Sequence, residues 1–237
     1  MPTRLRSAVC GAMILLAGAS SAPAQPRVVA TISPVHSIVA LVMEGVGDPQ
    51  LLLQGTESPH SVSLRPSQSR KLADADIVIR ISATFETFLV KPLRALSGRA
   101  LVVDLDRADG MRLLSVRGAH TDHDHDHDKP GHGSSIDPHI WLHTGNAAAM
   151  VRAVARALAS RDPENAATYN RNAARASIRL RALQIEIGRL LRPVRSRSFV
   201  TFHDAWQYFT DEFGLTFAGT LTVNPERKPG AKRLAAI

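Results

Sequence analysis

Cysteine is almost absent from this sequence, since Cys10 is its single representative among 237 residues. It lies in an apolar N-terminal run, too early and with Val9 before it, which argues against a lipoprotein acceptor. We expect this run to be removed, which leaves a mature chain without thiols. Disulfides and thiolate metal sites are then excluded. Any metal bound by this chain must take nitrogen and oxygen ligands.

Long apolar runs are also scarce. One occupies residues 8–19, after Arg4 and Arg6 and before the small residues of an A-x-A cleavage site at 22–24. This arrangement is typical of a secretory signal peptide and is too short and wrongly flanked for a membrane span. The sequence therefore predicts export, with residues 1–24 removed and no membrane segment in the remainder.

Aromatic residues make up only 5% of the chain, and acidic residues are outnumbered, which gives a formal net charge of +8. Most of the excess lies between Arg152 and Arg197, in sequence with helical periodicity. A basic chain can bind nucleic acid, but few aromatics accompany these arginines and the chain is exported. We interpret them as a solvated helix face and expect no nucleic-acid partner.

Residues 118–133, GAHTDHDHDHDKPGHG, contain five of the ten histidines, interleaved with aspartates. With almost no apolar residue, this segment cannot contribute to a core. Neutral imidazoles and carboxylates are both metal ligands, whereas an expression tag would be a terminal run of histidines and a polar spacer needs none. We predict a flexible loop with a weak metal site formed by His120, His123, His125, His127 and His132.

Short β-branched runs alternate with helical periodicity along the rest of the chain, a pattern typical of parallel sheets covered on both faces by helices. Residues 163–191 contain one possible breaker, Gly188, and predict a helix of roughly 40 Å that connects two lobes. Strands are expected at 28–32, 51–53, 76–81 and 100–105 in the first lobe, and at 198–202 and 215–221 in the second.

Three histidines outside the His-rich segment occur close to junctions between expected strands and helices: His60, His139 and His203. In open α/β sheets ligands gather at the carboxyl ends of strands. A single histidine at such a point is more often a capping or core residue, but three of them in a thiol-free exported chain indicate a metal site. Their wide separation leaves open whether they converge.

Six segments resemble, in order, the ZnuA family, the periplasmic zinc-binding proteins of bacterial ABC importers. They are VVATISPVHSIVALVMEGVG, PHSVSLRPS, DADIVI, DPHIWL, FHDAWQYF and VNPERKPGAKRL, and they extend over essentially the whole mature chain. The resemblance implies two α/β lobes joined by a long rigid helix, with Zn²⁺ in the cleft between them. It implies His60, His139 and His203 as the metal ligands, and it links the acidic His-rich loop to zinc.

The chain departs from the family pattern at three places. Some members have a carboxylate where Pro59 stands, so Glu57 becomes a candidate for the fourth ligand position. Many relatives have Asp-Pro where this chain has His143-Thr144. The second lobe of the family continues beyond the position of Ile237, so we expect an incomplete second lobe here, from a truncated reading frame or a fragment.

The expected organisation is a signal peptide (1–24), an N-terminal lobe (25–117, completed by 136–162), a flexible loop (118–135), a linking helix (163–192) and a partial C-terminal lobe (193–237). The expected function is high-affinity periplasmic zinc binding by a monomer that delivers Zn²⁺ to the membrane permease of an ABC importer, without catalysis. A metal buffer or adhesin of the same fold and a manganese- or iron-binding importer component remain open. A metallohydrolase is less favoured, because no HExxH-type helix is present.

Overall fold

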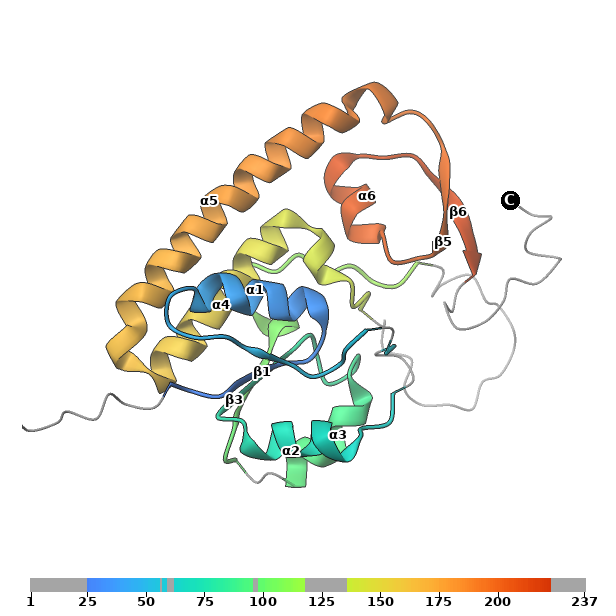
Figure 1. The fold of residues 1–237 in the computed structure, drawn as a ribbon. Coiled ribbons are helices and arrows are strands. Elements are labelled where there is room, and N and C mark those ends of the chain that lie inside the picture. Colours follow the sequence, from blue (N-terminus) through green and yellow to red (C-terminus); the bar gives the residue numbers. More distant parts are fainter. Residues whose placement is uncertain (1–24, 56, 59–61, 96–97, 118–135, 223–237) are drawn as a thin grey trace, which may run out of the picture.

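The computed structural model describes residues 25–55, 57–58, 62–95, 98–117 and 136–222, and its two α/β lobes are joined by a long helix (Figure 1). The first lobe contains a four-stranded parallel sheet in the order β2-β1-β3-β4. Its strands are β1 (Val28–Ala30), β2 (Gln50–Leu51), β3 (Ile77–Arg80) and β4 (Leu101–Asp104). The predicted fold class is confirmed.

Helices cover both faces of this sheet (Figure 1). Helices α1 (Ser33–Met43) and α4 (Thr144–Arg161) lie on one face, and α2 (Pro66–Asp74) and α3 (Val90–Ala95) lie on the other. Every residue of β1 and β3 is buried. Continuous apolar runs such as VVA and IVI suit this position, because both faces of a central parallel strand are covered.

The second lobe contains β5 (Phe199–His203), α6 (Gln207–Phe213) and β6 (Phe217–Thr222), and its two strands pair in parallel. It follows α5 (Ala166–Leu191), a 26-residue helix that at 1.5 Å per residue is roughly 39 Å long. The first half of α5 packs on α4 and α1, and its far end lies beside α6. None of the helices described here is long and apolar enough to cross a bilayer.

One expected helix is much shorter than its sequence pattern indicates. Instead of a helix over 84–96, the chain forms a 3₁₀ turn (Thr87–Leu89) followed by the short α3. The cause is Glu86, whose buried carboxylate accepts hydrogen bonds from the Ser82 amide (2.9 Å) and from the Thr31 hydroxyl (2.5 Å). These bonds hold residues 82–86 in a turn, and burial raises the pKa of Glu86.

His143 is the N-cap residue of α4. Its Nδ1 accepts hydrogen bonds from the amides of Gly145 (3.0 Å) and Asn146 (3.4 Å), which lack partners inside the helix. An imidazole acceptor at this position does what an aspartate N-cap does. The His143-Thr144 departure therefore preserves the start of the helix, slightly before the position near Asn146 that periodicity indicates.

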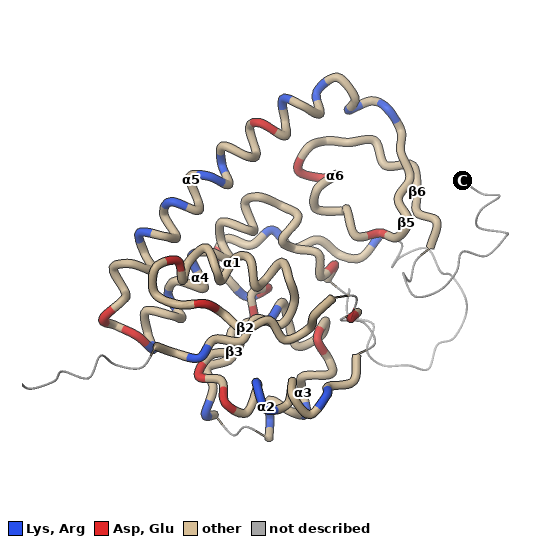
Figure 2. Tube along the Cα trace, viewed as in Figure 1, with Lys and Arg blue, Asp and Glu red and all other residues tan. Residues whose placement is uncertain are grey.

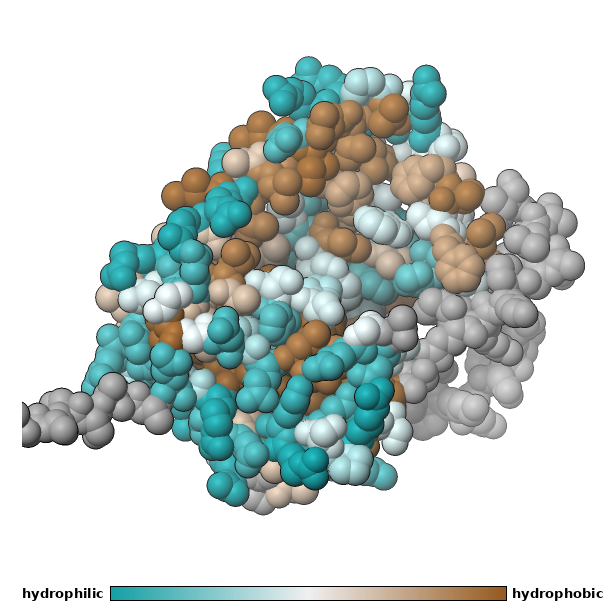
Figure 3. Space-filling view, in the orientation of Figure 1, coloured by the Kyte–Doolittle hydropathy of each residue, from teal (hydrophilic) through white to brown (hydrophobic). Residues whose placement is uncertain are grey.

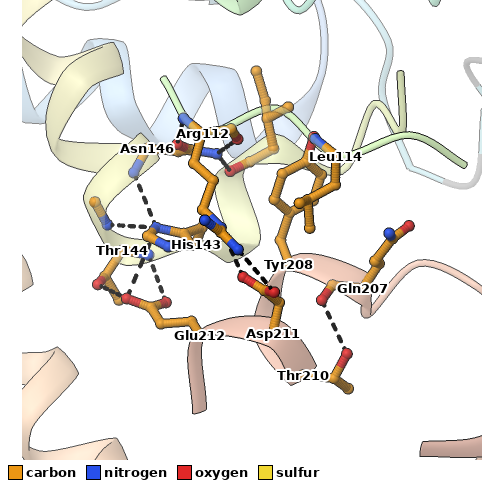
Figure 4. Close-up of polar contacts among 12 residues, drawn as sticks. Arg112, Leu114, His143, Thr144, Asn146, Gln207, Tyr208, Thr210, Asp211 and Glu212 are labelled. Carbon is orange, nitrogen blue, oxygen red and sulfur yellow. Dashed lines mark hydrogen bonds and ion pairs between the residues drawn. The ribbon is translucent and has the colours of Figure 1, made fainter. Parts of the chain in front are cut away.

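Polar contacts attach α6 to the first lobe (Figure 4). The Arg112 guanidinium donates to both carboxylate oxygens of Asp211, at 2.8 and 3.0 Å. The Glu212 carboxylate accepts from the backbone amide (2.8 Å) and the hydroxyl of Thr144. The Arg112 hydrogen bonds hold the pKa of Asp211 below its ordinary value, so this pair stays ionised. The orientation of the second lobe therefore depends on α6.

Asn172, on the buried face of α5, fixes the linking helix against α1. Its Nδ2 donates to the carbonyl oxygens of Val42 (2.9 Å) and Glu44 (2.8 Å), which lie where α1 ends. No backbone amide of α1 donates to these two carbonyl oxygens, so the Asn172 side-chain amide satisfies them. Because one side chain serves two carbonyls, its loss leaves two acceptors unpaired at once.

Replacing Asn172 by Ala is expected to lower the free energy of unfolding by about 2 kcal/mol, because buried carbonyls lose their donor. Urea unfolding followed by circular dichroism measures this change. Asn170→Ala is the matched control, since Asn170 lies exposed on the same helix and should change stability by less than about 0.5 kcal/mol. Equal effects of the two substitutions would contradict the assigned role.

Candidate metal centre

A cavity of about 500 Å³ lies between the lobes, where the parallel strands end. The first lobe contributes the end of β1 and the turn into α1, the loop after β2, and the segment that precedes α4. The second lobe contributes the residues that follow β5. The lining includes Ile32, Ser33, Pro34, Leu53, Glu57, Ser58, Phe85, His139, Trp141, Leu142, His203, Ala205 and Trp206.

His139 and His203 meet in this cavity from opposite lobes. His139 precedes the 3₁₀ turn Ile140–Leu142, and His203 is the last residue of β5. Their ring centroids are 5.7 Å apart. With Zn–N bonds of about 2.0–2.1 Å and tetrahedral angles, two histidines on one ion have ring centroids roughly 5 Å apart. The observed separation is thus close to that of two imidazoles sharing a metal ion.

Asp137 orients the His139 ring. Its Oδ1 lies 2.7 Å from His139 Nδ1 and also accepts the His139 backbone amide at 3.0 Å. The Asp137 side chain is only 4% exposed, so the Nδ1–H donates to a carboxylate that water hardly reaches. This tautomer places the imidazole lone pair on Nε2, the arrangement found in carboxylate–histidine–metal sites.

Arg117 of the first lobe reaches the segment beside His203. Its guanidinium donates to Asp204 (3.1 Å) and to the Thr210 hydroxyl, and it stacks over the Phe217 ring at 4.3 Å. Burial raises the pKa of Asp204, and the charge of Arg117 opposes that shift. Asp204 does not cap α6, because the N-cap residue there is Trp206. Its role is to bind Arg117 across the lobes.

Glu57, the candidate for the fourth ligand position, lies on the cavity wall with its carboxylate already bound by neighbours. It accepts the Gln54 amide (2.8 Å) and the Gln68 side-chain amide (3.1 Å), and it pairs with Arg65 (2.8 Å). The Gln54 amide has the largest part in lowering the Glu57 pKa, with Gln68 and Arg65 acting in the same direction. The group is therefore ionised at neutral pH.

The third predicted ligand, His60, lies outside the described residues. Ser58, two positions earlier in the chain, lines the cavity. The loop histidines His120, His123, His125, His127 and His132 also lie outside the described residues, between Arg117 and Ile136. Within the described part of the chain, no three His, Cys, Asp or Glu side chains are grouped as a metal site, so the structure brings together the pair His139 and His203.

Two residues of the centre did not stand out in the sequence. Asp137 is part of the DPH motif, and an aspartate two positions before a candidate histidine, with a rigid proline between them, is the signal that could have identified it. No local signal marks Arg117, because its partners Asp204 and Thr210 belong to the other lobe. His36, by contrast, lies near the start of α1 and its Nε2 is 3.0 Å from the Pro49 carbonyl oxygen, 13 residues along the chain.

The fold and the cavity define a two-lobed α/β protein of the solute-binding class. A crystal structure of ZnuA superposes with a TM-score of 0.76 at 24% sequence identity, over 90% of this chain and 76% of that one. Residues 28–237 match the family described as ZnuA, zinc-uptake complex component A periplasmic. The chain belongs to this family.

Two named relatives extend this comparison. The high-affinity zinc uptake system protein ZnuA of Brucella abortus (strain 2308) is 38% identical over 248 residues, which cover 93% of this chain and 74% of that protein. The protein of the same name from Paracoccus denitrificans (strain Pd 1222) is 36% identical over 243 residues, with the same coverage. The chain therefore spans about three-quarters of the length of these relatives.

Asp137→Asn is expected to weaken zinc binding about 10- to 100-fold, because a neutral amide orients His139 less firmly and makes its ring a poorer donor. Zinc titration against a competing chelator measures the change. Asp109→Asn serves as the control, since the Asp109 side chain is 92% exposed and pairs only with Arg156 among the described residues. Unchanged affinity in Asp137→Asn would show that the carboxylate has no part in the centre.

Proposed function

We propose that this chain is a periplasmic solute-binding protein that captures Zn²⁺ between its lobes and delivers it to the membrane permease of an ABC importer. The observation that carries the proposal is the approach of His139 and His203 across the cavity, at a ring separation that suits a shared ion. The zinc-uptake names of its relatives support the same conclusion.

The proposed ligands are His60, His139 and His203, with water or Glu57 in a fourth position. Three imidazoles and one oxygen satisfy the tetrahedral preference of zinc. Manganese and iron favour more oxygen ligands. Glu57 can join only if it exchanges part of its bonding to Gln54, Gln68 and Arg65, so we assign the fourth position to water in the resting site.

Delivery rather than catalysis is the proposed outcome of binding. A zinc hydrolase needs a general base near the metal-bound water. Each carboxylate described around the cavity has a strong partner of its own: Glu57 with Arg65, Asp137 with His139 and Asp204 with Arg117. These pairings favour ion storage in a fixed shell over proton transfer.

The proposal also covers the location of the protein and the division of its chain. Residues 1–24 act as the signal peptide, and the mature protein works in the periplasm as a monomer. We assign residues 25–117 and 136–162 to the first lobe, 118–135 to a His-rich loop that binds additional zinc weakly, 163–192 to the linking helix and 193–237 to a partial second lobe. A free-standing metal buffer or adhesin would share all of these except the permease.

Replacing His60, His139 or His203 by Ala is expected to weaken tight zinc binding by orders of magnitude, because each removes one of three nitrogen ligands. Metal analysis of the purified chain and chelator competition measure stoichiometry and affinity. His36→Ala is the matched control and should keep the affinity. Deleting residues 120–132 should leave one tight zinc per chain, and loss of tight binding from that deletion alone would refute the three-histidine site.

Zinc affinity is expected to fall steeply between neutral pH and about pH 5. Protons compete with the metal for each imidazole, and free histidine has a pKa of about 6.5, so lowering the pH converts ligands to the cationic form that cannot bind. Competition titrations across this range test the dependence. An affinity that stays constant from pH 7 to pH 5 would indicate a site made of carboxylates.

A further inference from the structure

Helix α5 carries a row of six exposed residues that neither the core nor the metal centre uses. Spacings of four and three residues place them on one face of the helix. We call this row the α5 stripe, and its members are Arg171, Arg175, Ile178, Ala182, Ile185 and Arg189. The buried residues of α5, which include Asn172 and Ala176, lie on the other side of the helix.

Two isoleucines at the middle of the stripe distinguish it from an ordinary solvated helix face. Ile178 is 71% exposed and Ile185 is 65% exposed. Single exposed apolar residues are common on protein surfaces. Here two of them share a face with Ala182 between them and arginines at both ends, and Figure 3 shows hydrophobic and hydrophilic side chains interspersed along the edge of the molecule where α5 runs. The surface is amphipathic rather than merely polar.

The charge of α5 is strongly one-sided. The helix contains five arginines and one acidic residue, Glu186, and Figure 2 shows the basic positions recurring along its length. Arg175 pairs with Glu44 at 2.6 Å, and both side chains are more than half exposed. Arg181 and Arg189 form no ion pair with any residue that the structure describes. Their charge is therefore available to an external anionic surface.

We propose that the α5 stripe docks on the surface of an anionic phospholipid bilayer. The stripe lies on a helix at the outer edge of the molecule, so it presents a ridge (Figure 1). A flat bilayer can take up such a ridge, whereas a protein partner would need a matching groove. The isoleucines enter the headgroup region while the arginine stems lie along it and their guanidiniums bind lipid phosphates. This proposal goes beyond zinc binding and does not depend on it.

Vesicle co-sedimentation of residues 25–237 tests the proposal. The probes are vesicles of phosphatidylcholine alone and of phosphatidylcholine with 30% phosphatidylglycerol, at low and at high salt. We expect retention on the anionic vesicles only, and its loss at high salt, since these contacts are screened. Retention that is equal on both vesicles, or absent from anionic vesicles at low salt, would overturn the proposal without the use of any variant.

A charge variant of the stripe, R171Q/R175Q/R189Q, should bind anionic vesicles about 100-fold more weakly, at roughly fivefold for each charge removed. Its matched control, R70Q/R94Q/R99Q, removes the same charge from exposed positions in and near α2 and α3 of the first lobe. This control should bind as the parent does. An equal loss in both would assign the binding to net charge and overturn the stripe.

An apolar variant, I178S/I185S, separates a bilayer from an acidic protein as the partner. It should weaken vesicle binding about tenfold, because it removes the side chains that enter the headgroup region. If I178S/I185S binds anionic vesicles as tightly as the parent does, and the parent binds soluble polyglutamate as tightly as it binds vesicles, the partner is an acidic protein surface and the lipid assignment is overturned. Thermal melts and zinc titrations of every variant should match the parent, which keeps this test independent of the zinc site.

Discussion

The contacts between α6 and the first lobe set the geometry on which the metal centre depends. His139 belongs to the first lobe and His203 to the second, so their separation is only as well defined as the orientation of the two lobes. Charge-assisted hydrogen bonds fix that orientation, from Arg112 to Asp211 and from Thr144 to Glu212. Such bonds are shorter and stronger than neutral ones.

The long helix α5 supports the same geometry from outside. Asn172 ties its first half to the end of α1, and Gln184 donates to Glu212 of α6 at 2.8 Å. One rigid element thus contacts both lobes, and Glu212 is bonded from both the first lobe and the linker. Lobes held in this way favour a preformed site. A preformed site loses little conformational entropy when it binds its ion.

Each carboxylate described beside the cleft has its own hydrogen-bond or ion-pair partner. Asp137 faces the His139 ring, Asp204 faces Arg117, and Glu57 faces Arg65 and two amides. Burial raises the pKa of Asp204, and the positive charge of Arg117 acts in the opposite direction. A cation entering the cavity meets the His139 imidazole held by Asp137, which raises the basicity of its ligand nitrogen without placing an unpaired charge in the cleft.

The sequence by itself determined the two α/β lobes, the connecting helix and the absence of thiol ligands, because periodicity and composition are local properties of the chain. Only the tertiary structure decided that His139 and His203 meet, that Asp137 orients the first of them, and that Glu86 cuts short the helix expected over 84–96. These outcomes depend on which segments pack together. The exposure of Ile178 was equally undecidable from sequence, because an apolar residue at helical spacing is buried or exposed according to what lies against that face.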